Sequence, residues 1–251
     1  MPAALPVISY CGPSPMPADL WGRWNLDPVL LAVMAIALGL YLLGCKHAPR
    51  DRTSFIAGMA VLAIIFISPL CALTVALFSA RVVHHVLLVA VAAPLLAWAL
   101  IDRISVNHRV LLARFLTPLL VFHAVIFWLW HAPAIYSLAL ASTPVYWAMQ
   151  VSLLSSAALF WASALLASPS RAITALLAVT VQMALLGAIL VFSSRPLYEP
   201  HFFTTEAFGI DPLWDQQLAG LIMWLPASLP YLLVAMLRLI AWLRQGEVRR
   251  A

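Results

Sequence analysis

Residues Phe122 to Pro133 read FHAVIFWLWHAP and place two histidines, His123 and His131, in one apolar run with helical character. A histidine in such a run costs free energy unless its ring finds partners. Eight helical residues turn through about 800°, so the two rings lie roughly 80° apart around the helix and ~12 Å apart along it. Pro133 ends the run. The stretch predicts a buried helix and raises the question of which other polar side chains reach its depth.

Composition indicates that this helix belongs to a membrane protein. The chain is 65% hydrophobic and 9% charged, whereas a soluble domain carries about 25% charged residues. Apolar runs of about 20 residues, long enough to cross a bilayer, recur along the chain. They are continuous and not alternating, which excludes a transmembrane β-barrel. The sequence therefore predicts an all-α, polytopic membrane helical bundle.

We predict seven transmembrane helices in this bundle. Their bounds are 28–45, 54–73, 75–101, 110–130, 145–167, 172–192 and 217–243. Residues 1–27 are rich in proline and lack a basic region before their apolar residues, so we interpret them as an N-terminal extracytoplasmic arm and not as a cleaved signal peptide. Residues 28–251 then form a single seven-helix transmembrane domain, since no internal repeat divides them.

The distribution of charge predicts the orientation. Eleven of the fourteen basic residues fall on one side of the predicted spans, namely Lys46, Arg50, Arg52, Arg103, Arg109, Arg114, Arg171, Arg238, Arg244, Arg249 and Arg250. The other side holds Arg23, Arg81 and Arg195 together with six acidic residues. The positive-inside rule then places the N-terminus outside and the C-terminus in the cytoplasm. The same rule explains the net charge of +5 without a nucleic-acid partner.

Depth along the spans predicts a site in the extracytoplasmic half. His85 lies ~15 Å below the outer end of the third span and His123 lies ~11 Å below the outer end of the fourth, so we expect these two rings to pair. His131 is expected at the outer rim. His84 points ~100° away from His85 and is expected to make a structural hydrogen bond. Imidazole and thioether ligands suit copper, and methionine favours Cu(I).

Further polar and sulfur-bearing side chains enter at this depth. Gln150 arrives with the fifth span and Met223 with the seventh, while Met183 lies in the outer half of the sixth. Methionines at helical spacing usually pack, and we expect that of Met183 and Met223 taken singly. Cys11, Cys45 and Cys71 lack metal-site spacing and are expected to be small buried residues. A disulfide or a soft-metal contact between Cys11 and Cys71 stays open.

Two other classes of function fit some of these residues. A metal permease would use buried polar residues as a pathway, but the cytoplasmic halves of the spans are almost purely apolar. A haem-binding electron-transfer protein would ligate iron through two histidines on facing helices, although a dihaem cytochrome would show four in two layers. No nucleophile–base pair, phosphate-binding loop or pair of catalytic carboxylates is evident, so we do not expect an enzyme.

The long segment 193–216 is the only sizeable predicted loop, and loops of this length are usually functional or disordered. It is rich in aromatic and acidic residues and is expected on the outer surface near the histidines. We consider it a candidate lid or partner-docking surface. An ordinary interfacial loop is the alternative.

The end of this loop carries a family resemblance. The sequence FGIDPLWDQQLAGLIMWLP (208–226), with HVLLVAVAAPLL (85–96), LWHAPAIYSLAL (129–140) and SRPLY (194–198), resembles the integral-membrane cytochrome c oxidase assembly factors of the CtaG type. The resemblance extends from the third span to the seventh. It implies a multi-pass protein of the bacterial plasma (inner) membrane that is needed to make active haem–copper oxidase. Delivery of copper to the binuclear centre of the oxidase is the role proposed for such proteins.

Several residues match the polar intramembrane positions of the family, namely His85, His123, His131, Asp215, Gln216 and Met223. Arg81 departs from the pattern, because many members have a histidine there. The start of the fifth span departs as well, with Tyr146, Met149 and Gln150 where many members have histidine or glutamate. An arginine cannot bind a metal cation and repels one nearby.

The mechanism that we expect is a transient copper site. His85, His123, His131 and Met223 would hold Cu(I), and the surrounding polar side chains would orient these ligands or form the mouth of the site. These surrounding residues are Asp215, Gln216, Gln150 and Arg81. The expected partners are the catalytic subunit of a haem–copper oxidase, an extracytoplasmic copper donor and membrane lipid.

Overall fold

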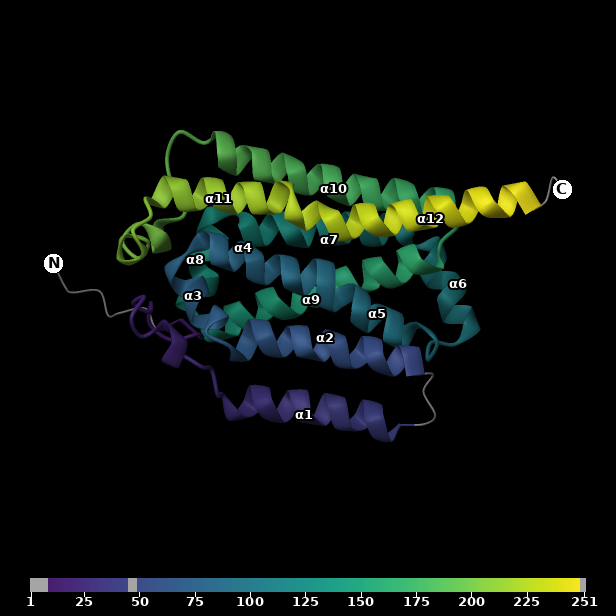
Figure 1. Ribbon diagram of the computed structural model, residues 1–251, viewed down its shortest axis with the longest axis horizontal. Helices are drawn as coiled ribbons and strands as arrows, with labels where there is room; N and C mark the ends of the chain where they lie inside the picture. Colours follow the sequence, from purple (N-terminus) through teal and green to yellow (C-terminus); the bar gives the residue numbers. More distant parts are fainter. Residues whose placement is uncertain (1–8, 45–48, 249–251) are drawn as a thin grey trace.

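The computed structural model describes residues 9–44 and 49–248, and these form a bundle of long helices that run side by side (Figure 1). Within these ranges the chain contains helices and turns but no β-strand. The α-helices are α1 (Pro28–Leu43), α2 (Pro49–Ile67), α3 (Leu70–Ala76), α4 (Phe78–Val86), α5 (Ala93–Ile101), α6 (Val106–Arg114), α7 (Leu116–His131), α8 (Pro133–Ala141), α9 (Thr143–Leu166), α10 (Pro169–Phe192), α11 (Pro212–Trp224) and α12 (Leu229–Val248). The shorter turns are η1 (Leu20–Gly22), the π-helical η2 (Leu87–Ala92), η3 (Glu199–His201), η4 (Glu206–Phe208) and η5 (Pro226–Ser228).

Helix starts follow from local sequence. Proline occupies the first turn of α1, α8, α9, α10 and α11, where its fixed φ suits a helix and its missing N–H costs nothing. Two of these prolines follow an aspartate. The Asp27 carboxylate accepts the Val29 N–H at 2.8 Å, and the Asp211 carboxylate accepts the Leu213 N–H at 2.8 Å. Both are side-chain N-caps of the usual kind.

The helix lengths make the chain a multi-pass membrane protein. Four segments are long and apolar enough to cross a bilayer, namely Phe78–Ile101, Thr143–Leu166, Pro169–Phe192 and Pro212–Gln245. Two bent pairs, α2 with α3 and α6 with α7, raise the number to six if each pair is one span. Helix α1 has 16 residues, which gives ~24 Å against a hydrocarbon core of about 30 Å. The seven-span topology and its orientation stay predictions.

The predicted spans agree closely with the helices where the apolar run is straight. The third, fifth and sixth spans begin and end within three residues of Phe78–Ile101, Thr143–Leu166 and Pro169–Phe192. Three interruptions were not predicted: a 48° bend between α2 and α3, a 67° bend between α6 and α7, and η5 within the last span. The predicted end of the first span at Cys45 and residues 1–8 of the arm lie outside the described residues.

The bend between α2 and α3 has a local cause. The α2–α3 bend falls at Ser68 and Pro69, where proline cannot donate to the helical ladder and the Ser68 hydroxyl donates instead to the carbonyl of Ile64 at 2.5 Å.

Helix α8 was also not predicted, because the sequence 133–141 is an apolar run too short to span. The predicted loop 193–216 is shorter than expected, since α11 already begins at Pro212.

Two glycines bring α10 and α11 into backbone contact. A Cβ atom on Gly187 would lie 2.7 Å from the carbonyl oxygen of Gly220, and a Cβ on Gly220 would lie 2.6 Å from that of Gly187. Small residues permit such close helix pairs in membranes, where packing drives association. This contact fixes α11, which in turn packs along α4. One end of the bundle carries α3, α8 and residues 193–211, and the other carries α6 and the end of α12 (Figure 1).

Candidate functional site

Helix α4 carries four buried polar side chains, Ser79, Arg81, His84 and His85. Its first residues are capped from another helix, because Leu77 has no side-chain acceptor. The Asp215 carboxylate of α11 accepts the backbone N–H of Phe78 at 2.6 Å and that of Ser79 at 3.2 Å, and it also accepts the Ser79 hydroxyl. Asp215 therefore positions the helix that presents the histidines.

The imidazole of His85 lies beside that of His131. Their ring centroids are 5.6 Å apart, and the centroids of His84 and His85 are 5.8 Å apart. Both ring nitrogens of His84 and of His85 are buried without a hydrogen-bond partner among the described residues. A buried imidazole without a partner is costly, so these rings are candidates for binding a group that the protein chain itself does not provide.

His131 is buried, although we expected it at the rim of the bundle. Its Nδ1 lies 2.7 Å from the carbonyl oxygen of Phe127. A carbonyl can only accept, so Nδ1 carries the proton and Nε2 carries the lone pair. A hydrogen bond of this kind commonly orients a histidine that ligates a metal through its other nitrogen.

His123 lies two helical turns from His131 on α7, ~12 Å along the axis. The Phe127 ring lies between them, with its centroid 4.4 Å from that of His131 and 6.2 Å from that of His123. We expected His123 to face His85, but the ring beside His85 is His131. Nδ1 of His123 lies 3.1 Å from the Ser156 hydroxyl, and its Nε2 is buried without a partner in the described chain.

Arg81 is a buried cation with few partners. Its guanidinium carbon lies 5.3 Å from the centroid of the Tyr146 ring, and its Nη2 donates to the carbonyl of Thr74 at 3.5 Å. Nε and Nη1 are buried with no hydrogen-bond partner, and Arg81 forms no ion pair within residues 9–44 and 49–248. Gln150 lies one turn along α9 from Tyr146, and both of its amide atoms are likewise buried and unpartnered.

These side chains share one buried region, which we call the polar cluster. It consists of Arg81, His84, His85, His131 and Tyr146, which are linked by the contacts given above, and of Gln150, one turn from Tyr146. Among the described residues, no group of three or more histidine, cysteine, aspartate or glutamate side chains is arranged to hold a metal ion. The geometry therefore offers a pair of imidazoles, His85 and His131, and not a closed multi-ligand site.

Two of the other predicted residues, Asp215 and Gln216, form hydrogen bonds with backbone groups of neighbouring segments. Gln216 accepts the Leu197 N–H at 2.7 Å and donates to the carbonyls of Leu190 at 3.3 Å and Arg195 at 3.5 Å, so it joins the 193–211 segment to α10. Met223 is buried on α11, one turn beyond Gly220. Asp215 and Gln216 thus hold the backbone that surrounds the histidines.

The segment 193–211 covers this end of the bundle. The Tyr198 hydroxyl donates to the carbonyl of His131 at 2.7 Å. His201 donates from Nδ1 to the carbonyl of Ala76 at 3.2 Å and accepts the Tyr136 hydroxyl at Nε2, at 2.7 Å. Burial lowers the pKa of His201 to about 3, and the nearby charge of Arg81 acts in the same direction. His201 was not predicted, and its only signal in the sequence is its place in the aromatic segment after SRPLY.

The N-terminal arm covers the polar cluster from another side. A disulfide joins Cys11 to Cys71 of α3, which decides between the options that the sequence left open. The Cys11 sulfur lies 3.7 Å from the Tyr146 hydroxyl, and the ring of Tyr10 stacks on that of Tyr146 with centroids 4.9 Å apart. The Tyr10 hydroxyl donates to Asp27 at 2.6 Å and lowers the pKa of that carboxyl.

Comparison with known families gives a match over most of the chain. The model of the family described as cytochrome c oxidase caa3 assembly factor (Caa3_CtaG) matches residues 30–245, which is most of the chain. The match covers every residue of the polar cluster and the glycine contact of α10 and α11. Comparisons with curated proteins and with solved structures gave no match.

Proposed function

We infer the function of the protein from two observations. The chain belongs to the cytochrome c oxidase caa3 assembly factor family, and its polar cluster contains an imidazole pair in which neither nitrogen of His85 has a hydrogen-bond partner among the described residues. We propose that it binds Cu(I) transiently between His85 and His131 and passes it within the membrane to the catalytic subunit of a haem–copper oxidase. Family membership favours this role over a metal permease or an electron-transfer haem protein.

The observation that carries the proposal is the pair itself. Two imidazoles that share a metal at about 2.0 Å from each nitrogen have ring centroids ~6 Å apart. The His85 and His131 centroids are 5.6 Å apart, and neither nitrogen of His85 has another partner in the described chain. His131 already presents an Nε2 lone pair, because its Nδ1 donates to Phe127. His123 and Met223 are then candidate second stations for the ion and not ligands of the same shell.

Arg81 favours Cu(I) over Cu(II) at this site. Its charge lies one helical turn from the histidines of α4, and the repulsion on a nearby cation grows with the charge of that cation. A monovalent ion with two ligands is therefore tolerated better than a divalent ion that needs four. The same repulsion keeps the affinity moderate, as a delivery protein requires.

We also propose seven spans with the polar cluster on the extracytoplasmic side of the bacterial plasma membrane. Two observations support this orientation. Disulfides persist in oxidising compartments, and the Cys11–Cys71 bond lies at the end of the bundle that carries α3 and α8. The opposite end carries the arginines of α2, α6 and α12, as the positive-inside rule expects of a cytoplasmic face.

The test is copper content, measured by mass spectrometry on protein purified under reducing conditions with Cu(I) supplied. Phenylalanine replaces histidine with a ring of similar size, so the variants are His85→Phe, His131→Phe and His123→Phe. The exposed His108 provides the matched control, His108→Phe. We expect near-stoichiometric copper in the wild type and in the control, and its loss in the first two variants.

Two results would contradict the proposal. Absence of copper from the reduced, supplemented wild type would exclude the delivery mechanism and leave the family role as a scaffold for the oxidase. Loss of copper in His123→Phe alone would move the site two turns along α7. In cells, the copper content of the oxidase should fall in parallel with the copper content of each variant.

A further inference from the structure

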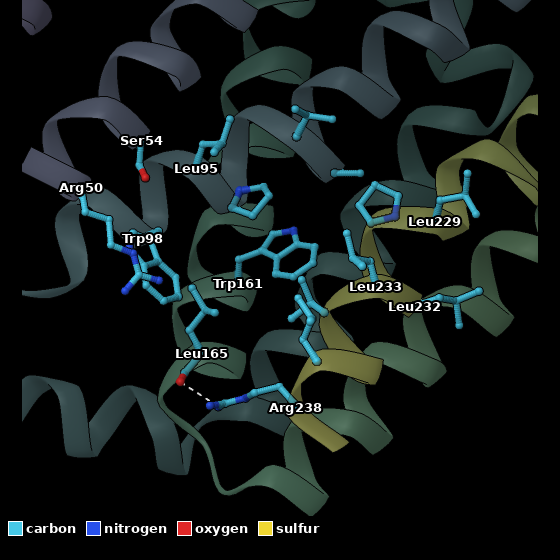
Figure 2. A pocket seen from close by; sticks show the side chains of 16 residues that line it. Arg50, Ser54, Leu95, Trp98, Trp161, Leu165, Leu229, Leu232, Leu233 and Arg238 are labelled. Carbon is cyan, nitrogen blue, oxygen red and sulfur yellow. Dashed lines mark hydrogen bonds between the residues drawn. The ribbon is translucent and has the colours of Figure 1, made fainter. Parts of the chain in front are cut away.

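A large groove opens between α12 and the central helices, away from the polar cluster. Its volume is about 1110 Å³. Trp98 and Leu95 of α5 and Trp161 of α9 form one wall, and Leu232 and Leu233 of α12 form the other (Figure 2). The lining is apolar except near Arg50, Ser54 and Arg238. An occupant must therefore be mainly hydrocarbon.

The length of the groove corresponds to one leaflet of a bilayer. On α12 its lining extends from Leu229 to Arg238, and nine helical residues rise ~14 Å. On the facing wall it extends from Ala90 to Trp98, which is ~12 Å. Half of the hydrocarbon core is about 15 Å, whereas a transmembrane helix of a partner protein would need a seam of about 30 Å. These lengths favour an acyl chain over a spanning helix.

Two arginines stand at the end of the groove away from Leu229 (Figure 2). The Arg238 Nη2 donates to the carbonyls of Ala164, Leu165 and Ala167 at 3.0, 2.8 and 2.9 Å, which fixes its side chain. Its Nε is buried and has no partner within residues 9–44 and 49–248. The Arg50 guanidinium stacks on the Trp98 ring, 4.0 Å from its centroid, and so keeps its N–H donors at the groove edge.

This end of the protein has an excess of positive charge. The described basic residues there are Arg50, Arg52, Arg103, Arg109, Arg114, Arg171, Arg238 and Arg244. Asp102 forms an ion pair with Arg109 at 2.9 Å, and the other described acidic residues of this end are Asp51 and Glu247. Guanidinium groups bind phosphate oxygens with strong, charge-assisted hydrogen bonds. The groove thus combines an acyl-sized apolar cleft with a cationic rim at headgroup depth.

We propose that this groove binds a diacyl phospholipid with an anionic headgroup, taken from the leaflet at the arginine-rich end. An acyl chain lies between the tryptophans of α5 and α9 and the leucines of α12, and the headgroup phosphate lies beside the guanidinium groups of Arg50 and Arg238. The lipid fills the space between α12 and the rest of the bundle.

The test is native mass spectrometry of the detergent-solubilised full chain, titrated with phosphatidylglycerol or with phosphatidylcholine of the same acyl composition. We expect one phosphatidylglycerol to be retained and phosphatidylcholine to be retained several-fold less. Arg50→Gln should weaken retention of phosphatidylglycerol about fivefold, the effect of one basic residue near a lipid surface. Arg244→Gln, on the exposed continuation of α12, should leave it unchanged.

A second pair of variants tests the apolar part. Leu233 lines the groove and Leu243 does not, and their exposed fractions are similar, 61% and 59%. Leu233→Trp should fill the groove and abolish retention, whereas Leu243→Trp should have no effect. Equal retention of both lipids, or equal effects within either pair of variants, would overturn the proposal. So would a photocrosslinker at position 233 that captures a protein helix in membranes and no phospholipid.

Discussion

The Asp215 carboxylate accepts the backbone N–H of Phe78 at 2.6 Å, so α11 supplies the N-terminal cap of α4. Asp215 belongs to the DQQLAG sequence on which the family resemblance rests, and α4 carries His84 and His85. We predicted that Asp215 would orient a ligand ring or form the mouth of a copper site. In the structure it caps the helix that carries the candidate ligand His85.

Replacing Asp215 with alanine leaves the N–H groups of Phe78 and Ser79 without their acceptor. The cost of buried, unpaired donors is about 1–3 kcal/mol each, so we expect Asp215→Ala to lower the thermal midpoint by several degrees and to reduce copper retention. Asp211→Ala removes an exposed cap of α11 and serves as control, with a loss of about 1 kcal/mol and no change in copper. Equal effects of the two variants on copper would contradict the positioning role.

Replacing Arg81 removes a buried positive charge beside the imidazole pair. We expect Arg81→Gln to raise the affinity for Cu(I) at least about tenfold, which corresponds to ~1.4 kcal/mol. Competition with a chromogenic Cu(I) chelator measures this. Arg114→Gln, at an exposed position, is the matched control. A weaker affinity in Arg81→Gln would mean that the guanidinium supports the bound ion through an anion and does not oppose it.

Acidification should destabilise the closed end of the bundle through His201. The pKa of His201 is about 3 in the folded protein and 6.5 in a free histidine. Between pH 3 and pH 6.5, His201 is therefore protonated in the unfolded chain and neutral in the folded protein. Stability is then fully present above pH 6.5 and falls as the pH drops toward 3, by at most about 1.4 kcal/mol per pH unit.

Thermal unfolding of wild type and His201→Gln between pH 4.5 and 7.5 measures this contribution. The difference between the two profiles isolates His201 from the other histidines, and the wild-type profile should be the steeper one. His108→Gln changes an exposed histidine and should reproduce the wild-type slope. If stability depends on pH in the same way in wild type and in His201→Gln, the pKa of His201 does not change on folding and the prediction is wrong.

The contact of Gly187 with Gly220 leaves no space for a side chain. Gly220→Val should force α10 and α11 apart and cost about 1–3 kcal/mol, the usual effect of overpacking, with loss of folded protein in detergent. A Cβ on Gly39 of α1 meets no atom within 4 Å, so Gly39→Val is the control and should be tolerated. Thermal midpoints in one detergent make the comparison. Tolerance of both variants would disprove the close approach.

The disulfide predicts a pattern of thiol labelling. The chain has three cysteines, and the Cys11–Cys71 bond leaves Cys45 as the one that can react. Maleimide labelling of the denatured, unreduced protein should therefore add one label, and labelling after reduction should add three. Addition of three labels without reduction would show that the bond does not form and would remove its support for the proposed orientation.

The helices were predictable where hydrophobicity alone decides them. The spans that begin at Phe78, Thr143 and Pro169 are apolar runs with polar or proline-containing ends, and their bounds were found within three residues. The 67° bend between α6 and α7 was not predicted, because the sequence prediction for residues 110–130 is one straight helix. The α8 helix was missed because nine residues are too few to give a signal of membrane spanning.

The sequence identified which histidines are buried at the candidate site, but not which two of them lie side by side. Buried His85, His123 and His131 could be identified because histidines in apolar runs are unusual. Depth arithmetic matched His85 with His123, since it assumed that all spans end in one plane. In the structure the 193–211 segment contacts the end of α7 through the Tyr198–His131 hydrogen bond, and the buried ring of His131 lies beside that of His85. Long-range contacts such as Asp215 with Phe78 have no local signal.

The hydrogen bonds of Tyr198 and His201 also bear on how long an ion bound at the proposed site would stay there. Because they tie the 193–211 segment to α7 and α8 beside the imidazole pair, a Cu(I) ion held there as we propose would leave only when this end opens. Its residence time then depends on the opening rate of the segment and not on the binding strength of two ligands. A site of modest affinity can in this way keep its cargo for long periods, and a client that loosens the segment would determine the moment of release.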